Sequence, residues 1–117
     1  MKTIIQVAEK VRDSIAKELG DSFPSGLGGD CAVSSYTLHK KLNRLGFKSK
    51  FVQGHYRMME HCWVEIDNLI IDITATQFGI KEKVYITRTN DKNYQPTRKR
   101  FLKKEFKLWP NYQKPNS

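Results

Sequence analysis

Three residues, Cys31, His61 and Asp72, have types and a spacing that could support acyl transfer through a thiol. Cys31 follows the glycine-rich stretch 26–29 and opens a predicted helix. Unpaired N–H groups and the dipole at a helix N-terminus lower the pKa of a thiol. The same N–H groups can stabilise an oxyanion on the carbonyl that the thiolate attacks. A lone cysteine at a helix start is also a common small buried residue, so a nucleophilic thiol needs a base nearby.

His61 is the predicted base, and Asp72 is its predicted partner. The strand that begins at His61 returns through the two-residue turn 67–68, which indicates a β-hairpin. In that register His61 lies across from Thr74 and diagonal to Asp72, which is within side-chain reach. A carboxylate inside an apolar run needs a partner, because burying it alone is expensive. We therefore expect Asp72 to accept a hydrogen bond from the imidazole and to fix its tautomer.

Three further residues are candidates for a substrate cleft beside the thiol. Gly29 and Asp30 immediately precede Cys31, and Asp30 is also a good N-cap for the helix. Alternate side chains of a strand share a face, so Trp63 is expected on the same face as His61. The indole could line the cleft or pack against the sheet, and the sequence leaves both interpretations open.

Cys62 is expected to face the core, on the opposite side of its strand from His61. A zinc site that used both residues would need adjacent strand side chains to turn to one side. No metal and no organic cofactor are therefore predicted. Two cysteines also do not make the dense pattern of a disulfide scaffold, so both are expected to be thiols.

The elements that position these residues follow from apolar periodicity. Apolar residues recur at helical spacing at Ile4, Ala8, Val11, Ile15 and Leu19. A second helix is predicted over 31–45, and strands over 47–56, 61–66, 69–73 and 83–88, with loop after Thr89. Helices followed by consecutive strands indicate an α+β fold with an antiparallel sheet. A chain of 117 residues is expected to form one domain, 1–117, with a basic C-terminal segment at about 81–117.

The net charge of +9 belongs almost entirely to that segment. Residues 1–80 hold ten basic and nine acidic side chains, whereas residues 81–117 hold eleven basic and three acidic ones. The asymmetry indicates an acidic partner, such as nucleic acid, an acidic protein or an anionic surface, or else a solvated face. The candidate contacts are Arg98, Lys99, Arg100, Lys103 and Lys104. With the aromatic residues between them, they define an alternative function: a basic module that binds nucleic acid or an acidic protein.

Location is predicted from what the chain lacks. No apolar run approaches the ~20 residues that a membrane span requires. The N-terminal stretch turns polar at Gln6 and has no apolar signal-peptide core. We expect a cytoplasmic protein, or one delivered to a target cell by a route not visible in the sequence.

Three strings of the chain resemble the papain-like and transglutaminase-like cysteine superfamily, and most closely its small papain-fold domains in bacterial and phage proteins. These strings are GGDC at 28–31, HCWVEI at 61–66 and IIDITATQFG at 70–79. The resemblance covers roughly the middle half of the chain. It implies a papain-like core in which Cys31 is the nucleophile, His61 the general base and acid, and Asp72 the residue that orients the imidazole.

The resemblance also implies the reaction. Members act as peptidases, transglutaminases, protein-glutamine deamidases or acyltransferases, all through an acyl-thioester. The sequence accordingly predicts a cysteine-dependent amide hydrolase or acyl transferase that acts on a protein or peptide. One departure concerns the oxyanion hole, because papain-like peptidases usually carry a Gln several residues before the Cys, and this chain has none between Gln6 and Gln53. Gln77 and Phe78 match the third string, but no physical role is predicted for them.

Overall fold

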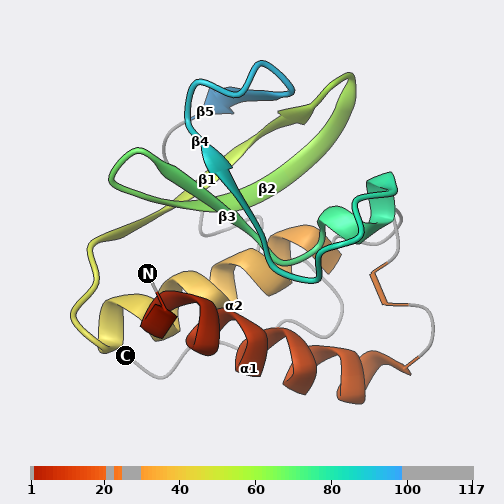
Figure 1. Ribbon diagram of the computed structural model, residues 1–117. Helices are drawn as coiled ribbons and strands as arrows, with labels where there is room; N and C mark the ends of the chain where they lie inside the picture. Colours follow the sequence, from red (N-terminus) through yellow and green to blue (C-terminus); the bar gives the residue numbers. More distant parts are fainter. Residues whose placement is uncertain (1, 21–22, 25–29, 99–117) are drawn as a thin grey trace.

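Two helices lie against one face of a five-stranded antiparallel sheet (Figure 1). The computed structural model describes residues 2–20, 23–24 and 30–98. The elements are α1 (Lys2–Leu19), α2 (Asp30–Arg44), β1 (Ser49–Tyr56), β2 (Met59–Ile66), β3 (Leu69–Asp72), a short 3-10 helix η2 (Ala75–Phe78), β4 (Tyr85–Arg88) and β5 (Tyr94–Arg98). The predicted α+β class, with N-terminal helices before an antiparallel sheet, is confirmed. Within this part of the chain no helix is long and apolar enough to span a membrane.

The sheet has the order β4-β3-β2-β1-β5, which puts β2 at its centre. The turn between β2 and β3 has Asp67 at a φ of 55°, the left-handed conformation that such tight turns use. Ile66 pairs with Leu69, and Val64 pairs with Ile71. The predicted hairpin register is confirmed, and this register decides where the side chains of the candidate site point.

The prediction of loop after Thr89 is wrong for Tyr94–Arg98, which forms the edge strand β5 against β1. Pro96 weakened the strand signal, since proline cannot donate to a ladder, yet an edge strand tolerates it. Element ends also differ from prediction: β1 and β4 begin two residues later, and β2 begins two residues earlier, at Met59. Asp30 is the first residue of α2, not the residue before it.

Both faces of the sheet are covered by apolar side chains. On the helix side the buried residues are Ile4, Ala8, Leu38, Leu42, Val64, Ile66, Ile71 and Ile73. On the other side they are Val52, Tyr56, Trp63, Ile70 and Tyr94. Side chains on β2 and β3 are therefore held in a packed environment on either face, where rotamer changes are costly.

Arg12 fastens α1 to the chain that follows β3. Its buried guanidinium donates from Nε to the Ile73 carbonyl oxygen at 3.0 Å and from Nη2 to Thr76 Oγ1 at 3.2 Å. Arg12 lies four residues after Ala8, so it shares the helix face that packs on the sheet. The segment between β3 and η2 is thus fixed from the helix layer.

We predict that Gly54→Ala destabilises the fold by about 1–3 kcal/mol, because overpacking a filled site has that cost. A Cβ at Gly54 would meet Pro96 Cα and Trp63 Cη2, each at 2.8 Å, and the Gln95 carbonyl oxygen as well. Urea denaturation followed by circular dichroism measures the change. Lys50→Ala, at an exposed position of the same strand, is the matched control. Equal stability of the two variants would contradict the close approach of β5 to β1.

Candidate active site

Asp72 is fully buried at the end of β3 and accepts hydrogen bonds at both carboxylate oxygens. Its Oδ2 receives His61 Nε2 at 2.7 Å and the Tyr94 hydroxyl at 2.8 Å. Its Oδ1 receives the Thr74 backbone N–H at 2.9 Å and the Thr74 hydroxyl at 3.3 Å. Four donors around one buried carboxylate offset the cost of removing it from water. The expected contact between His61 and Asp72 is present.

The His61 imidazole is enclosed by aromatic rings. Phe78 meets it edge to face, with ring centroids 4.7 Å apart, and Trp63 lies at 5.9 Å. Burial disfavours the charged ring, but hydrogen bonds to Asp72 and Cys31 and the charges of both outweigh it and raise the pKa of His61 to about 9. Because Nε2 is occupied by Asp72, Nδ1 is the nitrogen left for the thiol.

Cys31 lies in the first turn of α2, partly exposed, and packs against Ala32, Phe51 and Cys62. A hydrogen bond from the Cys62 thiol is the largest influence on it. Although burial opposes the charge, this bond and the interactions with His61 lower the pKa of Cys31 to about 5. The hydrogen bond to the Cys31 thiolate in turn raises the pKa of Cys62. At neutral pH the geometry favours a Cys31 thiolate beside a His61 imidazolium.

The thiol of Cys31 interacts with two adjacent strand residues, His61 and Cys62, whose side chains point to opposite faces of β2. The pairing of the strands explains how one thiol can reach side chains on both faces of β2. β3 pairs with β2 only from Val64 to Ile66, so the β3 side of β2 is unpaired at residues 61–62. In Figure 1 the start of α2 and η2 lie at this same end of the sheet. Cys62 is buried as expected, but its contact with Cys31 was not anticipated.

Three of the residues predicted for the cleft or for partner binding lie in described elements: Trp63, Asp30 and Arg98. Trp63 is fully buried, and its indole N–H donates to Glu65 Oε2 at 3.1 Å, so it packs the sheet and presents no surface to a substrate. Asp30 begins α2. Arg98 ends β5, opposite Gln53. Five predicted residues lie outside the described part of the chain: Gly29, Lys99, Arg100, Lys103 and Lys104.

Sequence reasoning missed three residues at this site: Tyr94, Gln77 and Phe78. Tyr94 comes from β5, the strand that was predicted as loop, and no local pattern connects it to Asp72. Gln77 Nε2 lies 3.5 Å from His61 Nδ1. Phe78 stacks on Tyr56 at 4.4 Å as well as meeting the imidazole. The signal available for both was only their place in the string that follows Asp72.

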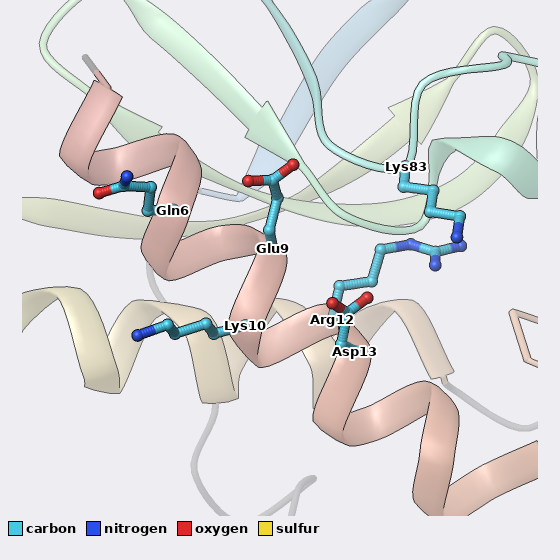
Figure 2. Close-up of a pocket in the computed structure, with 6 residues that line it drawn as sticks. All are labelled: Gln6, Glu9, Lys10, Arg12, Asp13 and Lys83. Atoms are coloured by element: carbon cyan, nitrogen blue, oxygen red, sulfur yellow. The ribbon is translucent and has the colours of Figure 1, made fainter.

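A shallow depression of about 530 Å³ lies elsewhere, over α1 (Figure 2). Its lining consists of Gln6, Glu9, Lys10, Arg12, Asp13 and Lys83. It contains none of the three candidate catalytic residues. Among the residues that the structure describes, no three His, Cys, Asp or Glu side chains are grouped to hold a metal ion.

Comparisons of the chain with protein-family models, with curated proteins and with solved structures gave no match. The chemical interpretation therefore rests on the residues and their geometry. Two of the predicted partners, His61 on β2 and Asp72 on β3, come from separate elements and are in contact.

We predict that iodoacetamide modifies Cys31 long before Cys62. The rate at Cys31 should rise through a pKa of about 5 and stay nearly level until His61 loses its proton at about pH 9. A thiolate is the reacting form, so a thiol with a lowered pKa reacts at mildly acidic pH. Peptide mass mapping across a pH series measures both sites. Preferential labelling of Cys62, or a Cys31 profile that rises only near pH 9, would contradict the assignment.

Proposed function

We propose that this protein is a cysteine-dependent amide hydrolase or acyl transferase that acts on a protein or peptide through a thioester on Cys31. The reaction is of the peptidase, protein-glutamine deamidase or transglutaminase type. One observation carries the proposal: a partly exposed thiol at a helix start lies against an imidazole whose far nitrogen is hydrogen-bonded to a buried carboxylate. Acyl transfer through a thiol requires a nucleophile, a base beside it and a group that orients the base.

The residues divide the chemistry between them. The Cys31 thiolate attacks the amide carbonyl carbon, and the C–O π electrons move to oxygen, where backbone N–H groups at the start of α2 stabilise the charge. As this tetrahedral intermediate collapses, the C–N bond breaks and the His61 imidazolium gives its proton to the leaving nitrogen. The products are an acyl-thioester, a free amine or ammonia, and a neutral imidazole.

The second half of the reaction returns the site to its starting state. Neutral His61 takes a proton from water or from an acceptor amine, which attacks the thioester carbonyl and expels the Cys31 thiolate. Asp72 keeps the Nε2 proton in place throughout, so that Nδ1 alone exchanges protons with the reacting groups. Water yields an acid and an amine yields a new amide, and both acceptors fit the same residues.

We predict a graded loss of turnover in three variants. Cys31→Ala should abolish it and His61→Ala nearly so, whereas Asp72→Asn should retain a trace after a loss of roughly 10²–10⁴-fold, because the carboxylate orients the base without reacting. Candidate proteins are incubated with each variant and examined by intact mass. Conversion of an amide to an acid marks deamidation, loss of ammonia marks cross-linking, and fragments mark proteolysis.

Matched controls separate these effects from damage to the fold. His55→Ala and Asp67→Asn change the same residue types away from the site, and both should leave turnover unchanged. Circular dichroism checks that every variant folds. Turnover that survives in folded Cys31→Ala would show that the nucleophile lies elsewhere.

The alternative function, a basic binding module, follows from the net +8 of residues 81–117. We predict that neutralising Arg98, Lys99 and Arg100 weakens binding of an acidic macromolecule and leaves Cys31 alkylation unchanged. At 0.1 M salt the screening length is ~10 Å, so binding should also fall as ionic strength rises. A single-stranded oligonucleotide and an acidic polypeptide, titrated across a salt series, are the probes. An affinity that changes neither with salt concentration nor with these substitutions would show that residues 81–117 act only as a solvated surface.

A further inference from the structure

Gln77 lies beside the His61 imidazole but has no part in the acyl-transfer steps proposed above. It is half-buried on η2, and its side-chain Nε2 lies 3.5 Å from His61 Nδ1. Nδ1 is the nitrogen that faces the thiol, since Asp72 occupies Nε2. The carboxamide of Gln77 therefore lies beside the Cys31–His61 contact, where the carbonyl of a substrate joined to the sulfur would have to be.

The segment that carries Gln77 is fixed from several sides. Arg12 binds Thr76 from the helix layer at 3.2 Å. The Gln77 backbone N–H donates to the Thr74 carbonyl oxygen, and Phe78 packs on the imidazole. Gly79 then ends the turn at a φ of 88°, a conformation that favours glycine. A carboxamide on such a fixed turn is preorganised, as a group that stabilises developing charge must be.

The protonation of His61 determines what this carboxamide can bind. The pKa of His61 is raised to about 9, so at neutral pH Nδ1 carries a proton in the resting ion pair. A protonated Nδ1 has no lone pair to accept a hydrogen bond. In this state Nδ1 cannot accept from the amide N–H groups of Gln77, and the oxyanion formed next to Cys31 would be an oxygen acceptor for them.

We propose that Gln77 is a catalytic residue whose side-chain N–H donates to the substrate carbonyl oxygen as Cys31 attacks. The inference rests on the proposed function and names a second donor beside the backbone N–H groups of α2. It implies that the reacting carbonyl lies between the start of α2 and η2, and that the site accepts substrates able to place an acyl oxygen against a carboxamide.

A different role for Gln77 makes a different prediction. If the Gln77 carboxamide is rotated by about 180°, its Oε1 accepts a hydrogen bond from the protonated Nδ1 and stabilises the imidazolium. Gln77 would then be a positioning residue that acts through His61, and its loss would change every reaction of the Cys31 thiolate. A donor to the substrate oxygen changes only reactions that form an oxyanion.

Two small probes of Cys31 separate these roles. p-Nitrophenyl acetate acylates the thiolate through a tetrahedral oxyanion and releases p-nitrophenolate, whereas iodoacetamide alkylates it by displacing iodide, with no oxyanion at carbonyl carbon. In Gln77→Ala the acylation rate should fall on the order of 10²-fold, the usual effect of removing one such donor. The alkylation rate of Cys31 should keep its wild-type value.

Gln77→Met sharpens the test because a thioether side chain of similar size cannot donate an N–H to the oxyanion and places no new charge beside His61 and Cys31. Acylation should fall about as far as in Gln77→Ala, while alkylation is retained. Gln95→Ala, at an exposed glutamine that donates to the Lys92 carbonyl oxygen, is the matched control and should change neither rate. Circular dichroism confirms that each variant is folded.

The outcomes are distinguishable. Equal acylation in the wild type and both Gln77 variants would overturn the role of Gln77 and leave the proposed function standing. A parallel fall in acylation and alkylation would also overturn it, in favour of positioning through His61. Acylation of wild-type Cys31 no faster than that of Cys62 would contradict the proposed function, and the inference would fall with it.

Discussion

The hydrogen bond between His61 and Asp72 is the interaction on which the rest of the candidate site depends. Burying a lone carboxylate costs several kcal/mol, so Asp72 persists at the end of β3 only because the imidazole, Tyr94 and Thr74 donate to it. Each donor comes from a different position in the chain. The hairpin register, the edge strand β5 and the turn after β3 must all form before the carboxylate is satisfied.

That bond also determines the chemistry of the thiol. With Nε2 committed to Asp72, the imidazole presents Nδ1 to Cys31, and the charge on Asp72 favours imidazolium over imidazole. The hydrogen bond from the Cys62 thiol, and after it the imidazolium, then favour a thiolate at Cys31. A structural ion pair would explain the buried carboxylate equally well, but it would not require a partly exposed thiol at the start of a helix. The proposal of acyl transfer follows from that thiol.

Local patterns predicted the parts of this arrangement that depend on short-range spacing. Alternation along β2 and the two-residue turn were enough to place His61 near Asp72, and helical periodicity was enough to place Cys31 at a helix start. Contacts between distant segments were not predictable in this way. Tyr94 lies 22 residues after Asp72, on a strand whose sequence signal is weakened by Pro96. Gln77 is positioned beside His61 only by the packing of η2 against the sheet. The segment beyond β5 lies outside the described residues, so its predicted binding role stays a prediction.

The most direct test of this account is an NMR titration of the His61 imidazole in the wild-type chain and in Asp72→Asn. If the buried carboxylate controls the site, His61 remains protonated above neutral pH and titrates with a pKa of about 9. In Asp72→Asn the pKa should fall, because the charge that favoured imidazolium is gone while burial still opposes it. A wild-type pKa near the ordinary value of 6.5, unchanged by the substitution, would contradict the account.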